Sequence, residues 1–94
     1  MDELIKALSI LSQYLRDDYY KDFPTQCEHD VFYVCGVKLS QMDANTVTKL
    51  IELGFTPGSP NDTNYYWDNL TQEEWKQRWP FLTDCFHSYK YGSC

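Results

Sequence analysis

The chain has 94 residues, of which 14 are acidic and 8 are basic, so its formal net charge is −6. This length predicts one domain over residues 1–94, because dividing it would leave two units too small to bury a core. Hydrophobic residues make up 43% and aromatic residues 17% of the chain, which disfavours a disordered chain and a disulfide scaffold. The acidic charge argues against direct nucleic-acid binding and against anionic membranes, since both attract Lys and Arg.

The N-terminal region favours a cytoplasmic protein. Residues 1–3 (Met-Asp-Glu) are acidic where a secretory signal requires positive charge. Lys6 and Ser9 interrupt the apolar residues that follow, so no stretch is long and apolar enough to cross a bilayer. We therefore expect a cytoplasmic location, no membrane association and reduced cysteines.

The first predicted element is a helix over residues 2–20. Leucines recur at steps of four, three and four, at Leu4, Leu8, Leu11 and Leu15. This spacing places them on one helical face. The helix is expected to stop before Phe23-Pro24, because the residue that precedes a proline avoids helical backbone angles.

A strand and a second helix are predicted next. A strand is predicted over residues 29–35, because its residues 31–35 are apolar on both faces, which is typical of a central strand. Ser40 and Asp43 resemble a capping box that would begin the helix. The helix should end at Leu53, because Gly54 suits the left-handed position of a Schellman stop.

The last third of the sequence predicts two strands and a helix. Residues 65–67 are expected to form a short strand. A capping box of Thr71 and Glu74 should begin the third helix, which Pro80 should end or kink. Residues 86–91 alternate as a final strand does. The order of elements predicts an α+β fold, in which a small, about three-stranded and largely antiparallel sheet packs with three helices.

Three short segments are familiar as a set. They are His-Asp followed by β-forming residues at 29–34, Leu-Ile-Glu-Leu-Gly-Phe at 50–55, and Ser-Tyr-Lys-Tyr-Gly-Ser-Cys at 88–94. Together they resemble a family of small uncharacterised bacteriophage and prophage proteins. The resemblance implies a phage origin and, by analogy with other small acidic phage proteins, an anti-CRISPR or other anti-defence role in an infected host cell. The family has no assigned reaction, so no catalytic residues carry over.

Two Cys-x-His steps suggest an alternative function. Cys27 and His29 form one step, and Cys85 and His87 form the other. Their sulfur and nitrogen donors are the ligand types of a zinc site, or of a thiol activated by an imidazole. The spacing differs from that of known structural zinc sites, so buried thiols and hydrogen-bonded histidines are the favoured interpretation, and no cofactor is expected. A small metal-binding or thiol-dependent protein is the alternative.

Acidic and aromatic residues predict a partner-binding face. Its candidate residues are Asp17, Asp18, Tyr19, Tyr20, Tyr65, Tyr66 and Trp67. Carboxylates complement a basic protein surface, and Tyr and Trp are common anchors in interfaces, although an ordinary solvated surface would contain the same residues. The leading hypothesis is a non-enzymatic inhibitor, monomeric or homodimeric, that binds a host defence protein or complex through this face. A self-associating phage accessory protein is a further alternative.

Overall fold

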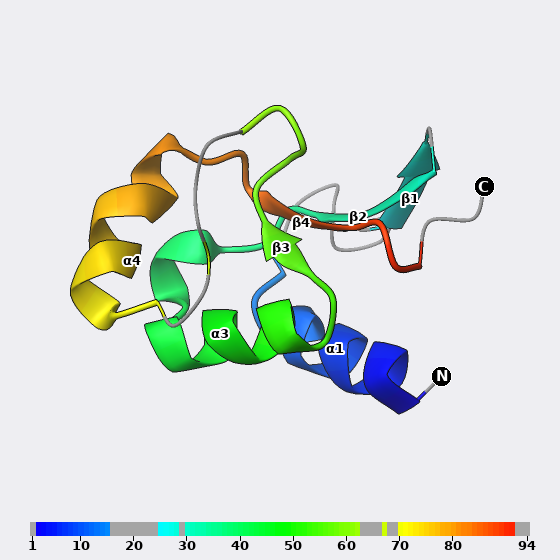
Figure 1. Ribbon diagram of the computed structural model, residues 1–94, viewed down its shortest axis with the longest axis horizontal. Helices are drawn as coiled ribbons and strands as arrows, with labels where there is room; N and C mark the ends of the chain where they lie inside the picture. The colour runs from blue at the N-terminus through cyan, green and yellow to red at the C-terminus, as the bar shows by residue number, and fades with distance from the viewer. Residues whose placement is uncertain (1, 16–24, 29, 63–66, 68–69, 92–94) are drawn as a thin grey trace.

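The computed structural model describes residues 2–15, 25–28, 30–62, 67 and 70–91 (Figure 1). The helices in this part of the chain are α1 (Asp2–Ser12), α3 (Ala44–Glu52) and α4 (Gln72–Arg78), with short 3₁₀ turns η1 (Leu39–Gln41) and η2 (Trp79–Phe81). The strands are β1 (Thr25–Glu28), β2 (Val31–Cys35), β3 (Thr56–Pro57) and β4 (Cys85–Ser88). Helices α1 and α3 lie on one side of the sheet, and α4 lies beyond one end of it. The predicted α+β class is therefore confirmed.

The sheet is antiparallel throughout, with the strand order β1-β2-β4-β3. The central strands β2 and β4 correspond to the predicted strands over residues 29–35 and 86–91, although β4 begins and ends earlier. The edge strands β1 and β3 were not predicted, because four mostly polar residues and a Thr-Pro pair lack a clear β pattern. Of the predicted strand at 65–67, only Trp67 is among the described residues, and it is not in a strand.

A tight hairpin joins β1 to β2. Glu28 pairs with Val31, and Asp30, in the turn directly before β2, has a φ of 62°. Such turns require positive φ, which Asp tolerates better than most residues. Strand β2 therefore begins at Val31, later than the predicted strand over residues 29–35, because Asp30 is needed for the turn.

Helix α1 is shorter than predicted. It ends at Ser12, and the chain beyond it joins the sheet region: Leu15 forms an antiparallel bridge with Val37, and the N–H of Lys38 donates to the Tyr14 carbonyl at 2.7 Å. A helix to residue 20 is wrong for residues 13–15, and residues 16–20 lie outside the described part. The leucine spacing continues to Leu15, but the N–H groups of Gln13 and Tyr14 donate to carbonyls only three residues back, and Leu15 pairs with Val37 instead of continuing the helix.

Helix α3 begins later than predicted and ends as predicted. Its N-cap is Asp43, whose Oδ1 accepts from the Thr46 N–H at 2.7 Å, whereas Ser40 lies in η1. At its end the N–H of Phe55 donates to the Leu50 carbonyl at 2.8 Å, and Gly54 has a φ of 99°. This is the Schellman pattern.

Helix α4 begins at the predicted capping box. The Glu74 N–H donates to Thr71 Oγ1 at 3.2 Å, and the Thr71 hydroxyl donates to the Glu74 carboxylate at 3.1 Å. Trp75 is fully buried, and its indole N–H donates to the Met42 carbonyl at 2.8 Å. This bond ties α4 to the residues that precede α3.

The two faces of the sheet have different surroundings. The inner face, defined by Phe32, Val34, Phe86 and Ser88, is turned toward α1 and α3. Val34 and Phe86 belong to the main core, with Leu11 and Leu50 from the two helices. The outer face, defined by Val31, Tyr33, Cys35, Cys85 and His87, is opposite, because side chains alternate along a strand.

The loop after β3 lies beside part of the outer face. The carbonyl of Gly58 is 2.7 Å from His87 Nδ1, and the Gly58 N–H donates to the Cys85 carbonyl at 2.6 Å. Asp62 Oδ2 accepts from the N–H groups of Ser59 at 2.8 Å and Thr83 at 3.0 Å. His87 and Cys85 are consequently buried, although neither faces the helices.

Candidate functional site

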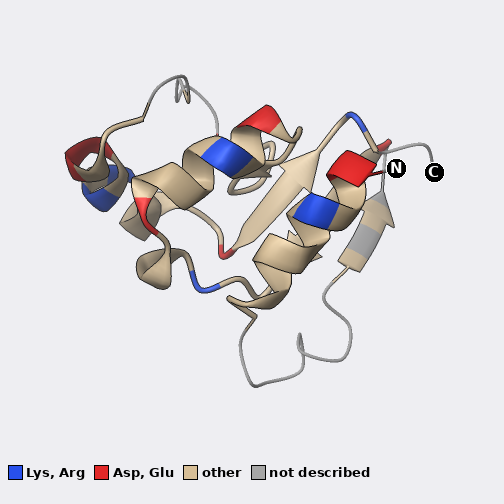
Figure 2. Ribbon diagram, turned by 90° about the horizontal axis from the view of Figure 1, so that it is seen from below, with Lys and Arg blue, Asp and Glu red and all other residues tan. Residues whose placement is uncertain are grey.

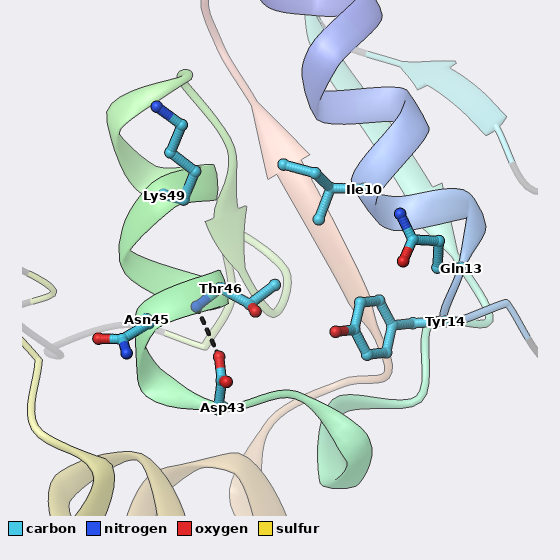
Figure 3. A pocket seen from close by; sticks show the side chains of 7 residues that line it. All are labelled: Ile10, Gln13, Tyr14, Asp43, Asn45, Thr46 and Lys49. Carbon is cyan, nitrogen blue, oxygen red and sulfur yellow. Dashed lines mark hydrogen bonds between the residues drawn. The ribbon is translucent and has the colours of Figure 1, made fainter.

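A shallow pocket lies between α1 and α3 (Figure 3). Its volume is about 320 Å³, which is small for a ligand site but large enough for a single side chain from a partner. Its lining residues come from the end of α1 and the two residues after it, and from α3 and its N-cap. They are Ile10, Gln13, Tyr14, Asp43, Asn45, Thr46 and Lys49. Two elements far apart in the sequence thus build this pocket.

The pocket combines an apolar wall with polar groups. Ile10 and the Tyr14 ring lie on the α1 side, and the Tyr14 hydroxyl is directed toward the beginning of α3 (Figure 3). Hydrogen bonding to the side chain and backbone N–H of Thr46 lowers the pKa of Asp43, so this carboxylate is charged at neutral pH. Lys49 lies farther along α3 and points away from Tyr14. These groups can bind a polar or positively charged side chain.

Most of the predicted partner-binding residues cannot be placed. Asp17, Asp18, Tyr19, Tyr20, Tyr65 and Tyr66 lie outside the described residues. Trp67 is described and half-buried, and its ring packs edge-on against Trp75, with centroids 6.3 Å apart. The guanidinium of Arg78 lies over the Trp67 ring at 5.6 Å. Trp67 therefore contributes to internal packing, and only part of its surface is open to a partner.

Charges of both signs alternate on the described helices (Figure 2). Lys6 follows the acidic start of α1, Lys49 precedes Glu52 on α3, and α4 has acidic residues in its first turn and basic residues in its last. Glu74 and Arg78 form an ion pair on α4 at 3.4 Å. Within the described residues, the helices thus form no uniformly acidic face.

The two Cys-x-His steps do not converge among the described residues. Cys27 is on the edge strand β1, with β2 between it and β4, which carries Cys85 and His87. Cys27 pairs with Phe32, so its side chain belongs to the inner face, whereas Cys85 and His87 belong to the outer face. Among described residues, no three His, Cys, Asp or Glu side chains are close enough together to hold a metal ion. His29 lies outside this part of the chain.

The cysteines differ in oxidation state. Cys27 is disulfide-bonded, whereas Cys35 and Cys85 are free thiols. The expectation that all cysteines are reduced is therefore wrong for Cys27. Burial, with smaller contributions from the charges of Cys35 and Asp62, raises the pKa of Cys85 to about 12. This thiol is protonated at neutral pH, which disfavours it as a nucleophile activated by His87.

The pocket and the facing thiols of Cys35 and Cys85 were missed by sequence reasoning. No local signal links Tyr14 to Asp43, because the packing of α1 on α3 brings them together.

Within the described residues, no helix has the length and apolar character of a membrane span. No protein family, curated protein or solved structure matches the chain.

Proposed function

We propose that this protein is a phage-encoded, non-enzymatic inhibitor of a host defence complex, of the anti-CRISPR kind, which acts by occupying a basic surface of its partner. The phage origin rests on the resemblance of the segments at 29–34, 50–55 and 88–94. The net charge of −6 supports a basic partner, because opposite charges accelerate encounter and suppress other partners.

The pocket between α1 and α3 is the observation that carries this proposal. It is large enough for one side chain, and the Tyr14 ring and the Asp43 carboxylate suit an Arg or Lys. In the sequence, Tyr14 precedes Asp17 and Asp18 by three and four residues. A partner that inserts a basic side chain beside Tyr14 would thus meet the predicted acidic residues nearby along the chain.

Binding is a better use of these groups than chemistry. Asp43 already caps α3, and the Thr46 hydrogen bonds that lower the pKa of its carboxyl make it a weak base. The amides of Gln13 and Asn45 are suited to hydrogen bonding rather than to proton transfer. The pocket therefore provides an apolar wall, hydrogen-bonding groups and one carboxylate, and these groups suit a small recognition site.

Charge reversal tests the electrostatic part of the proposal. The tagged protein captures its partner from a lysate of the bacterial host, and mass spectrometry identifies it. Surface plasmon resonance against that partner then compares the wild type with the double variant Asp17→Lys/Asp18→Lys. We expect association to slow about tenfold at low salt and the difference to shrink at high salt, because peripheral charges act mainly on the association rate.

A matched control separates a local effect from net charge. The double variant Glu52→Lys/Glu73→Lys changes the net charge equally, at exposed positions of α3 and α4. It should slow association less than the variant at 17 and 18. Equal slowing by both variants would mean that net charge, and not the position of residues 17 and 18, controls the association rate. An unchanged association rate in both variants would contradict the proposal.

Aromatic truncation tests the centre of the interface. Tyr66→Ala should accelerate dissociation about thirtyfold, because truncating a desolvated anchor costs about 2 kcal/mol. Tyr89→Ala is the control, since Tyr89 is 64% exposed, directly follows β4 and does not line the pocket. If Tyr89→Ala has the larger effect, the binding face is at the end of the sheet and the assigned face is wrong.

A further inference from the structure

Two free thiols face each other across the central strands of the sheet. Cys35 on β2 and Cys85 on β4 are directly paired residues of the antiparallel ladder, and neither is in a disulfide. Directly paired residues have their side chains on the same face, here the outer face. The thiols also interact as hydrogen-bond partners. They are therefore neighbours in space although 50 positions separate 35 from 85 in the sequence.

The backbone hydrogen bonds beside Cys35 and Cys85 show which kind of antiparallel pair these two residues form. The N–H of Gly36 donates to the Asp84 carbonyl at 2.9 Å, so the neighbouring position of the ladder is a hydrogen-bonded pair. The Cys85 carbonyl instead accepts from the Gly58 N–H at 2.6 Å, on the side of β3. Antiparallel pairs alternate, so Cys35 and Cys85 form a non-hydrogen-bonded pair, whose Cα atoms are about 4.5 Å apart. Disulfides span Cα separations of roughly 4.4–6.8 Å.

We propose that Cys35 and Cys85 are a dithiol pair that a small-molecule disulfide converts into a cross-strand disulfide between β2 and β4. The pair is separate from the existing disulfide of Cys27, which lies on β1 and on the other face of the sheet. It is also separate from the pocket between α1 and α3. The proposal therefore stands whether or not the proposed binding function is correct.

The exposure of the two thiols sets the order of the reaction. Cys35 is partly exposed, whereas Cys85 is only 3% exposed, so an external disulfide meets Cys35 first. Cys35 loses its proton to solvent, and its thiolate attacks one sulfur of the reagent, which breaks the reagent's S–S bond and releases one thiolate. Cys85 then loses its proton and attacks the Cys35 sulfur, which expels the second thiolate. Two protein thiols are oxidised, and one reagent disulfide is reduced to two thiols.

The surroundings make this reaction slow at neutral pH. Burial raises the pKa of Cys35, although the hydrogen bond with Cys85 counteracts part of this. Burial also raises the pKa of Cys85, and Asp62 and Asp84 add to the shift through their negative charge. The thiolate is the reactive form. As long as the pH is below the thiol pKa, the oxidation rate should therefore rise about tenfold for each unit by which the pH is increased.

The cross-link would join the point where β2 leaves the sheet to the point where β4 enters it. It would close a long loop that contains α3, β3 and α4. Closing a loop restricts the unfolded chain more than the folded one, so the oxidised protein should be more stable. We expect its Tm to rise by about 5 °C or more.

The experiment uses the folded protein with its Cys27 disulfide intact. Incubation with 2-hydroxyethyl disulfide at alkaline pH, followed by acid quenching, should remove the mass of two hydrogen atoms. Peptide mapping without reduction should show a peptide that links Cys35 to Cys85. Cys35→Ser should neither form this link nor accumulate an adduct on Cys85, because Cys85 is buried. Cys85→Ser should accumulate the mixed disulfide on Cys35.

Two results would overturn the proposal. One is a mixed disulfide on Cys35 of the wild type that persists without conversion to the cross-link. The other is a cross-link that forms only when denaturant unfolds the protein, because the folded ladder would then not hold the thiols in position. Cys35→Ser changes a partly exposed residue, so it keeps the test valid if Cys85→Ser fails to fold.

Discussion

The two faces of the sheet differ in what buries them. The inner face is closed by two helices and is mostly apolar, whereas the outer face has a histidine and two thiols beside a loop. Both faces of β4 are nevertheless buried, and Phe86 and His87, which are adjacent in the chain, are 0% and 7% exposed. Burial by itself therefore does not identify the core: the inner face contributes most of the apolar contact, and the outer face relies on hydrogen bonds.

The largest expected difference between the faces comes from neighbouring residues of β4. Phe86→Ala should lower the free energy of unfolding by about 3–5 kcal/mol, because it leaves a large cavity among the helices. Cys85→Ala is the matched control on the outer face, and it should cost about 1 kcal/mol, since it removes a single sulfur. Urea denaturation followed by circular dichroism measures both. Equal costs would mean that the two faces contribute alike.

A second prediction concerns the carboxylate that holds the loop on the outer face. Burial alone would raise the pKa of Asp62, but hydrogen bonds from Ser59 and Thr83 outweigh it and lower the pKa below its ordinary value of 3.8. Asp62→Asn should cost about 1–2 kcal/mol at neutral pH, as expected for hydrogen bonds to a charged group.

The pH dependence of this cost follows from the direction of the shift. A lowered pKa in the folded protein stabilises it at pH values above the unfolded pKa, and this contribution is lost as the pH falls through the folded pKa. The stability difference between wild type and Asp62→Asn should therefore be constant near neutrality and shrink below about pH 4. Urea titrations at several pH values test this, and a difference that grows on acidification would contradict it.

A third prediction concerns α4, which lies beyond the end of the sheet. The stability that its N-terminal cap provides should not depend on either face of the sheet. Thr71→Ala should cost about 1 kcal/mol, because the Glu74 N–H loses its acceptor. Thr71→Ser keeps the hydroxyl and should cost only a few tenths of that. Thermal unfolding of both variants shows whether the hydroxyl is responsible. Equal losses would point to the methyl group instead.

The smallest expected effect is a gain in stability on the inner face. Ser88 is 1% exposed, and its hydroxyl finds no hydrogen-bond partner among the described residues. Ser88→Ala should stabilise the protein by up to about 1 kcal/mol, because a buried unpaired hydroxyl is unfavourable. A loss of stability, measured by the same denaturation, would show that the hydroxyl does have a partner and that the inner face is less apolar than described.

Sequence reasoning was most successful where one short segment determines the structure. The Schellman stop at Gly54 and the cap at Thr71 both involve bonds between residues at most five apart, so the pattern of residue types was sufficient. The candidate site was less predictable. The pocket joins Tyr14 to Asp43 across two helices, and six of the seven predicted anchors lie outside the described residues.

The sequence by itself determined the α+β class, the two central strands and the ends of helices that are set by local hydrogen bonds. Only the tertiary structure decided that α1 stops at Ser12, that two short edge strands complete the sheet, and that Cys35 faces Cys85. The physical reason is the range of the interactions. Caps and turns connect residues a few positions apart, whereas strand order and register depend on which apolar surfaces the folded chain buries against each other.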